Sequence, residues 1–152
     1  MDTKYFEKIR IFDGGMGQEL LSKGLISKGT LWSASALIER EFHKLVIDAH
    51  MSYINAGADI IVTNNFSARK IRFIQNKVLD KFQYANEQAG ILANKAREIS
   101  KQNILIAGSL PSQSDTYVED ERSSSEIQSD FEEQAKIISP YVDFFYLDVV
   151  SS

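Results

Sequence analysis

The chain has 152 residues, of which 43% are hydrophobic and 25% charged, with a formal net charge of −4 and a pI near 5.2. A chain of this size and apolar content can bury one core without disulfides or a structural metal, so we expect a single globular domain. Basic residues are scattered among acidic ones, which argues against nucleic acid as a partner. No run approaches the roughly 18 apolar residues of a membrane helix, and the start, MDTKYFEKIR, lacks the apolar centre of a signal peptide. We therefore expect a cytoplasmic protein with no membrane partner.

Four short apolar runs, rich in β-branched and aromatic residues, predict buried strands. They are IRIF at 9–12, DIIVT at 59–63, ILIAGSL at 104–110 and DFFYLDVV at 143–150. A polar stretch at 109–126 follows the third run and is expected to form a long loop.

Apolar residues between these runs recur at helical spacing and predict three helices with one apolar face each. The apolar positions are Phe42, Leu45, Val46, Ala49 and Tyr53, then Ala85, Ala89, Leu92, Ala93, Ala96 and Ile99, then Ile127, Phe131, Ala135 and Ile138. Ser123 and Glu126 have the spacing of a capping box, and Gly57 stands where the first helix should end in a left-handed residue.

Strands that alternate with helices indicate a parallel sheet with right-handed crossovers. Two architectures remain open, a doubly wound open sheet and a (β/α)8 barrel, which needs eight units and about 250 residues. Four strands do not close such a barrel, and the last predicted strand runs to Val150 with no helix after it. We therefore expect residues 1–152 to form one incomplete domain, truncated after the fourth strand.

Polar residues stand at the carboxyl end of each predicted strand. They are Asp13-Gly14-Gly15, Thr63-Asn64-Asn65, Ser109 and Asp148. In either architecture these ends share one rim, where parallel α/β proteins bind ligands, although each residue alone would also suit a turn or a helix cap. Asp13 beside two glycines suits an α-amino acid, because the carboxylate can pair with an ammonium group while exposed N–H groups take a carboxylate.

Successive segments of the chain carry a family resemblance, in order and over nearly its whole length. DGGMGQELL, LWSASAL, HMSYINAGADIIVTNNFSA, ILIAGSLPSQSDTY and DFFYLDVVSS resemble the N-terminal blocks of the homocysteine S-methyltransferase family. The resemblance implies an α/β fold, the N-terminal half of a (β/α)8 TIM barrel with about four β/α units. It also implies transfer of a methyl group from a sulfonium, betaine or methylated folate to homocysteine, whose thiolate is held by zinc on three cysteines of later strands.

The resemblance also implies roles for individual residues. Asp13, Gly14 and Gly15 would hold the homocysteine backbone, and Asp148 occupies the position of a family glutamate that binds the amino group. Substrate-pocket positions are also expected at Thr63, Asn64 and Ser109, and a donor pocket at Trp32 and Phe66. Two departures are Asp148, shorter than glutamate by one methylene, and Asn65, where threonine is more usual.

The cysteine ligands for zinc are absent from this sequence. The two histidines, His43 and His50, lie seven residues apart on one predicted helix, hence about 10 Å along its axis, too far to share one zinc ion. We expect His50 at the surface of this helix or at the edge of the core. We also expect no catalytic residue and no bound zinc in this chain, although zinc is the cofactor of the family.

Two functional hypotheses follow. In the first, the chain is the N-terminal portion of a zinc-dependent homocysteine S-methyltransferase, inactive by itself, whose partners are homocysteine, a methyl donor and a missing C-terminal half. In the second, it is a non-catalytic half-barrel that binds an amino acid or serves as an assembly module. Uncovered strand edges and apolar faces would then favour self-association.

Overall fold

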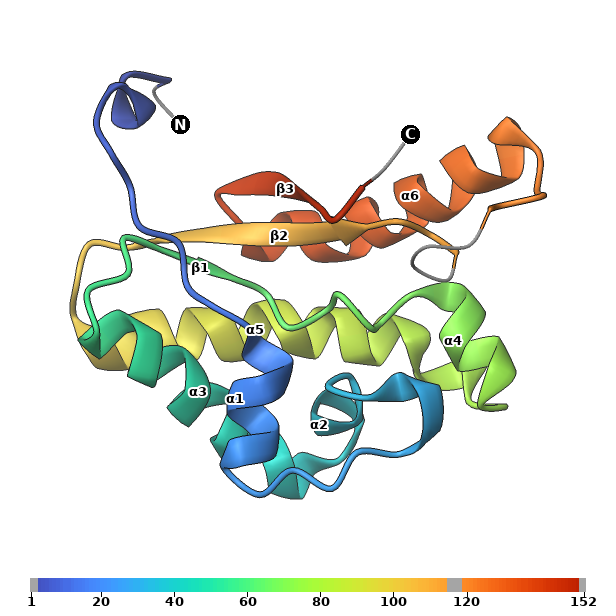
Figure 1. Ribbon diagram of the computed structural model, residues 1–152, viewed down its shortest axis with the longest axis horizontal. Helices are drawn as coiled ribbons and strands as arrows, with labels where there is room; N and C mark the ends of the chain where they lie inside the picture. Colours follow the sequence, from blue (N-terminus) through green and yellow to red (C-terminus); the bar gives the residue numbers. More distant parts are fainter. Residues whose placement is uncertain (1–2, 115–118, 151–152) are drawn as a thin grey trace.

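The computed structural model describes residues 3–114 and 119–150 and contains a parallel three-stranded sheet. Its strands, in the order β1–β2–β3, are β1 (Ile60–Val62), β2 (Leu105–Pro111) and β3 (Phe144–Asp148). Each strand pairs with the next one along the chain, and a helical segment connects each pair (Figure 1). The predicted α/β class with parallel strands is confirmed.

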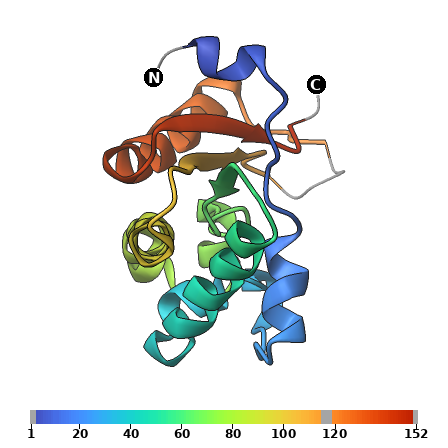
Figure 2. The same ribbon diagram turned by 90° about the vertical axis from the view of Figure 1, so that its left-hand side faces the viewer.

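The three longest helices are the ones that hydrophobic spacing predicts, namely α3 (His43–Asn55), α5 (Phe82–Ser100) and α6 (Ser124–Ile138). α3 and α5 lie together on one side of the sheet (Figures 1 and 2), and α6 packs against α5 and β2. The expected capping box starts α6. Gly57, with φ of +102°, follows α3 in a conformation that glycine adopts without strain.

Shorter helical segments join these elements, and the apolar spacing did not predict them. The α-helices are α1 (Met16–Ser22), α2 (Ser35–Ile38) and α4 (Lys70–Gln75). The 3₁₀ turns are η1 (Thr3–Glu7), η2 (Gly29–Leu31), η3 (Arg40–Phe42), η4 (Leu79–Lys81) and η5 (Ser139–Tyr141). Segments of one or two turns are too short to show a helical period.

The buried core has two parts. Leu20, Leu37 and Val46 belong to a cluster among the helices. Ile61 and Ile106 belong to a second cluster, which fixes the sheet onto α3 and α5. α3 and α5 therefore cover one face of the sheet. Among the described residues, no helix is long and apolar enough to cross a bilayer.

The prediction of a first strand at 9–12 is wrong in extent. Only Phe12 forms an isolated parallel bridge, to Ile60, and Asp59 Oδ2 accepts a hydrogen bond from Ile11 N at 2.9 Å. Ile9 and Ile11 are 95% and 58% exposed. Because these two side chains are exposed, apolar burial does not hold the segment in a longer ladder.

The last strand and the long loop are also shorter than predicted. β3 ends at Asp148 because Val149 has φ of +52°, which turns the backbone out of the strand. The loop predicted at 109–126 spans only the residues between Pro111 and Ser124, since β2 and α6 take both of its ends. Positions 115–118 of this predicted loop lie outside the described residues.

Candidate amino-acid binding site

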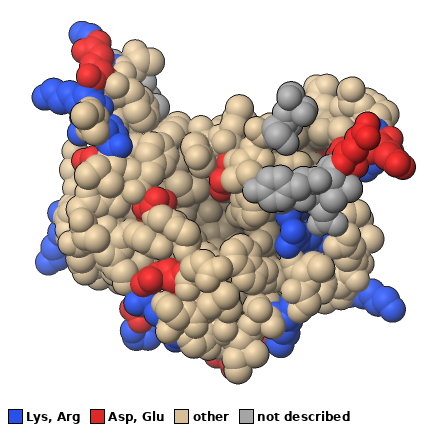
Figure 3. Space-filling model, in the orientation of Figure 1, with Lys and Arg blue, Asp and Glu red and all other residues tan. Residues whose placement is uncertain are grey.

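A pocket of about 320 Å³ opens at the carboxyl ends of the strands, and it is lined almost entirely by residues that flank them. Figure 3 shows a hollow near the middle of this face, bordered mainly by uncharged side chains with acidic ones at its edge. Every predicted site residue except Ser109 lines the pocket, namely Asp13, Gly14, Gly15, Trp32, Thr63, Asn64, Phe66 and Asp148. The expectation that Asp13 and Asp148 face one rim pocket is confirmed.

Asp13 is fixed by bonds between its own segment and β1. Its backbone N donates to Ile60 O at 2.9 Å, and its Oδ2 accepts from Val62 N at 2.9 Å. Burial raises the pKa of Asp13 to about 7, and the negative charge of Asp148 adds to the effect, while the bond from Val62 opposes it. A cation bound beside Asp13 would favour its charged form.

Asp148 enters the pocket from the end of β3. Its Oδ2 accepts a hydrogen bond from Ser109 Oγ at 2.8 Å. Burial raises the pKa of Asp148, and the bond from Ser109 limits this rise. The two acids therefore reach one pocket from elements 135 positions apart in sequence (148 minus 13), without any basic residue among the described residues that line it.

Two of the glycines after Asp13 allow aromatic rings to pack closely against the backbone. A Cβ on Gly14 would lie 2.9 Å from the ring of Tyr53, and one on Gly17 would lie 2.4 Å from the ring of Trp32. Gly15 precedes α1 as its N-cap and has open space beside it. Sequence reasoning missed Gly17, although its spacing in DGGMG marks a further position without a side chain.

Trp32 also lines the pocket and has a strained backbone conformation, with φ of +45°. Asn64 Nδ2 donates to Ser33 O at 3.1 Å and so holds this turn beside the segment that follows β1. Phe12 and Tyr146 supply further aromatic surface, with ring centroids 5.4 Å apart. Tyr146 was also missed, although it stands two residues before Asp148 and thus on the same face of the strand.

Ser109, by contrast, does not line the pocket. It is fully buried in β2, and its hydroxyl group is engaged with Asp148. Thr63 Oγ1 accepts a hydrogen bond from Ser109 N at 3.0 Å, which connects this serine to a residue that does line the pocket. The structure thus places Ser109 behind the pocket wall.

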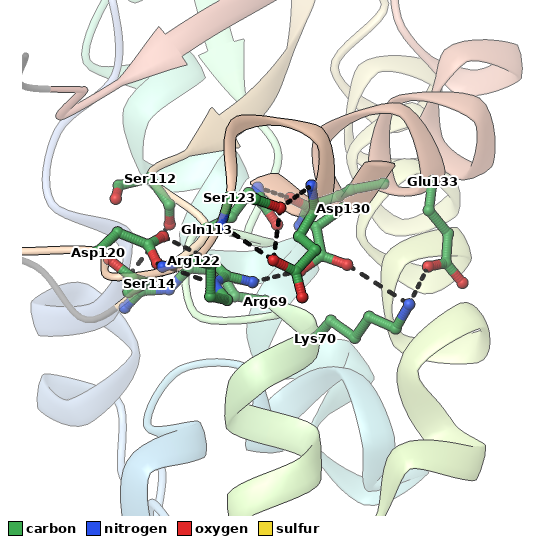
Figure 4. A network of polar contacts seen from close by, with 12 residues as sticks. Arg69, Lys70, Ser112, Gln113, Ser114, Asp120, Arg122, Ser123, Asp130 and Glu133 are labelled. Atoms are coloured by element: carbon green, nitrogen blue, oxygen red, sulfur yellow. Dashed lines mark hydrogen bonds and ion pairs between the residues drawn. The ribbon is translucent and has the colours of Figure 1, made fainter. Parts of the chain in front are cut away.

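Charged contacts tie the loop after β2 to neighbouring helices (Figure 4). Arg122 donates from Nε and Nη2 to the two carboxylate oxygens of Asp120, at 2.9 and 2.7 Å, and from Nη1 to Asp130 of α6 at 2.6 Å. Lys70 of α4 lies 3.4 Å from the other oxygen of Asp130. Asp130 of α6 is therefore bonded both to the loop, through Arg122, and to α4, through Lys70.

Arg69 connects the same loop to the pocket wall. Its guanidinium is fully buried and donates to the carbonyl groups of Ser112, at 3.2 Å, and Ser114. The same group lies 5.3 Å from the ring centroid of Phe66, which lines the pocket. The position of Phe66 therefore depends on how the loop after β2 is held.

The residues of the chain do not fit a zinc site. The sequence has no cysteine, and within the described ranges no three acidic or histidine side chains gather as a metal site would require. Nε2 of His43 lies 3.0 Å from Leu37 O. His50 is fully buried, neither ring nitrogen has a hydrogen-bond partner among the residues that the structure describes, and burial lowers its pKa to about 3. The expectation of His50 at a surface or core edge is therefore wrong, since Val46 and Ile54, four residues away on each side, are buried with it.

Comparisons with known proteins show which family the chain belongs to. Residues 10–152 match the family described as homocysteine S-methyltransferase. The homocysteine S-methyltransferase of Escherichia coli is 32% identical over 115 residues, which cover 68% of this chain and 35% of that enzyme. Homocysteine S-methyltransferase 2 of Zea mays is 34% identical over 90 residues, covering 59% of this chain and 24% of that protein.

Solved structures agree with the sequence comparisons. The metallated form of the homocysteine methyltransferase MmuM from Escherichia coli superposes with a TM-score of 0.78 at 26% identity, over 94% of this chain and 55% of that chain. Its oxidized form superposes with a TM-score of 0.81 at 24% identity. The chain spans about half the length of these structures and about a third or less of the two relatives above. The chain belongs to the homocysteine S-methyltransferase family.

Proposed function

We propose that this chain provides the homocysteine-binding side of an S-methyltransferase site. The observation that carries the proposal is that two carboxylates, Asp13 and Asp148, line one pocket at the carboxyl ends of parallel strands. An α-ammonium group between them would form two charge-assisted hydrogen bonds. It would also offset the burial, and the smaller repulsion from Asp148, that raise the pKa of Asp13.

The rest of the pocket suits the remainder of an amino-acid substrate. The backbone of Gly14 and Gly15 lines the pocket beside Asp13 and would take the substrate carboxylate. Thr63 and Asn64 would border the side chain of homocysteine. The methyl donor, a sulfonium, a betaine or a methylated folate, would lie toward Trp32 and Phe66. In the reaction, the substrate sulfur gains a bond to the methyl carbon as the bond from that carbon to the donor breaks.

The metal of the family would have to be held by residues outside this chain, since the described side chains offer no suitable set. We propose that residues 1–152 are the first part of a (β/α)8 barrel, with about four β/α units, and that a C-terminal half supplies the metal ligands. The sequential strand order and the 55% coverage of the Escherichia coli structure support this arrangement. The chain alone would then bind homocysteine without methylating it.

A second candidate is a non-catalytic half-barrel that binds an amino acid or assembles with another copy. Exposed apolar side chains on β3 favour it, since Phe145 and Leu147 are 40% and 66% exposed. The two candidates share the amino-acid pocket and differ in what covers the sheet. An activity assay distinguishes them. If a C-terminal half of the barrel is added to the chain, the first candidate predicts that homocysteine is converted to methionine, and the second predicts that it is not.

The homocysteine pocket is tested by calorimetric titration of the chain with homocysteine. Asp13→Asn should weaken binding about 10- to 100-fold, since a charged hydrogen bond contributes roughly 1.5–3 kcal/mol. Asp59→Asn is a matched control, because Asp59 Oδ2 also accepts a backbone N–H across the same pair of segments, from Ile11, but lies at the other end of β1. Equal affinities of wild type and Asp13→Asn would refute the assignment.

Asp148→Glu tests the departure from the family glutamate. If reach limits the contact with the ammonium group, the longer side chain should tighten homocysteine binding. Zinc content after dialysis gives a separate readout, and a stoichiometric, tightly held zinc ion on the chain alone would contradict the proposed source of the metal.

A further inference from the structure

The backbone N–H and C=O groups of Ser109 both bond to side chains of the segment that follows β1. Thr63 Oγ1 accepts from Ser109 N at 3.0 Å, and Asn65 Nδ2 donates to Ser109 O at 2.9 Å. The ladder between β1 and β2 ends at the pair Val62 and Ala107. The two side chains therefore replace the strand that would otherwise bond Ser109.

The direction of each hydrogen bond in this group is fixed by the backbone. Thr63 Oγ1 accepts the N–H of Ser109, so its single hydrogen is available for Asn65 Oδ1, 2.6 Å away. Because the carbonyl of Ser109 only accepts, the nitrogen of the Asn65 amide must face it. Ser109 Oγ then has its own hydrogen free to donate to Asp148.

Asn65 is itself held by a second layer of buried amides. Its Nδ2 also donates to Asn86 Oδ1 at 3.2 Å, and Gln134 Nε2 donates to the same oxygen at 3.0 Å. Asn86 Nδ2 in turn donates to the carbonyls of Ala68 and Phe82. The amide side chains of Asn65, Asn86 and Gln134 are all fully buried. The Asn65 amide therefore has one orientation, fixed by Asn86 of α5 and Gln134 of α6. This orientation in turn holds the backbone carbonyl of Ser109 in place.

We propose that Asn65 is a positioning residue for the pocket carboxylate Asp148, acting through Ser109. Asn65 does not line the pocket, and its effect on a ligand passes through the bond from Ser109 Oγ to Asp148. The contact of Asp148 with the ammonium group of homocysteine rests on the proposed function. The hydrogen-bond chain itself can be tested without any substrate.

The test is an NMR titration of the Asp148 carboxyl group in the whole chain, with ¹³Cγ-labelled aspartate and assignment by Asp148→Asn. Ser109→Ala removes the donor and should raise the pKa of Asp148, because the bond from Ser109 favours the charged form. Asn65→Ala should shift the same pKa upward by at least half as much. Homocysteine binding, measured separately, should weaken in both variants.

Asn94→Ala is the matched control for a simple loss of stability. Asn94 Nδ2 also donates to two carbonyls, those of Gly90 and Tyr141, but it lies about two helical turns beyond Asn86 along α5. It should lower the unfolding midpoint and leave the Asp148 titration unchanged. If Asn65→Ala does not fold, Thr63→Val breaks the same chain at nearly constant shape and should raise the pKa likewise.

An unchanged Asp148 titration in folded Asn65→Ala, or an equal shift in Asn94→Ala, would overturn the proposal. So would an unchanged titration in Ser109→Ala. Because homocysteine is absent from the titration, a chain that fails to bind homocysteine yet shows the expected shifts would refute the proposed function and leave the positioning role intact.

Discussion

The carboxylates of Asp13 and Asp148 line one pocket, and the charge of Asp148 helps burial to raise the pKa of Asp13 to about 7. At pH 6 most Asp13 side chains are therefore neutral in the empty pocket. An ammonium ligand binds the ionised form better, so its binding should release a proton from Asp13.

Homocysteine affinity is accordingly expected to rise about tenfold between pH 6 and pH 8, because the ionised fraction of a group with a pKa near 7 rises by that factor. Titration calorimetry in buffers of different ionisation enthalpy measures both the affinity and the proton release. Asp148→Asn removes the repelling charge and should move the midpoint of the pH dependence downward. An affinity independent of pH over this range would count against the shared pocket.

Gly17→Ala should displace the ring of Trp32, because the added Cβ would lie 2.4 Å from it. Trp32 is the only tryptophan in the chain, so its fluorescence reports the displacement directly. The emission maximum is expected to shift. Gly15→Ala is the control, since nothing lies within 4 Å of its Cβ, and it should leave the spectrum unchanged. Identical spectra for the two variants would show that the tight contact is absent.

Buried His50 should make the fold sensitive to acid. Its pKa is lowered from 6.5 to about 3, so the unfolded chain binds a proton that the folded chain excludes between these values. The free energy of unfolding is thus fully retained above pH 6.5 and falls as the pH drops toward 3, by about 2 kcal/mol at pH 5 from this residue.

Denaturant unfolding at pH 7 and pH 5 measures this loss for wild type and for His50→Leu, in which the group is removed. Asp13 titrates with the opposite sign, because its raised pKa makes the folded chain bind the extra proton. The difference between the two proteins isolates His50. If both lose the same stability between these pH values, His50 is not held neutral by burial.

The chain is expected to self-associate or to bind a missing half of the barrel through the exposed face of β3. Burying apolar surface contributes about 25 cal/mol per Å², so a few hundred Å² suffice for dimerisation at micromolar concentration. Leu147→Lys should shift the mass measured by light scattering toward the 17.2 kDa monomer. Ile99→Lys, at a 50% exposed site on α5, should have no effect. A compact wild-type monomer at high micromolar concentration would contradict this expectation.

The strands β1, β2 and β3 were predictable because each lies in a continuous apolar run, and the helices α3, α5 and α6 because each has enough residues to show its hydrophobic period. The helical period also predicts that His50 is buried, because Val46 and Ile54, four residues before and after it, are buried on the same face of α3. We expected it at the surface or core edge because histidine is a polar residue. The short first strand was not predictable. Its length depends on whether a helix covers Ile9 and Ile11, which is a matter of tertiary structure.

A place in the pocket was predictable for residues at the carboxyl end of a predicted strand, such as Asp13, Thr63 and Asp148. The position of Ser109 behind the pocket wall was not, because it depends on the register in which β2 pairs with β3. Nor does the sequence indicate that Asn65, Asn86 and Gln134 meet, since buried amides have no period and come from separate elements. Their contact is visible only in three dimensions.

The sequential order of the sheet bears on how the protein folds as it is made. Because β1, β2 and β3 pair in the order in which the ribosome releases them, each new strand can add to an edge that already exists. Asp148 arrives last, after Ser109 and the residues that hold it are in place. During synthesis the pocket therefore gains its second carboxylate only once the residues that orient it have been made.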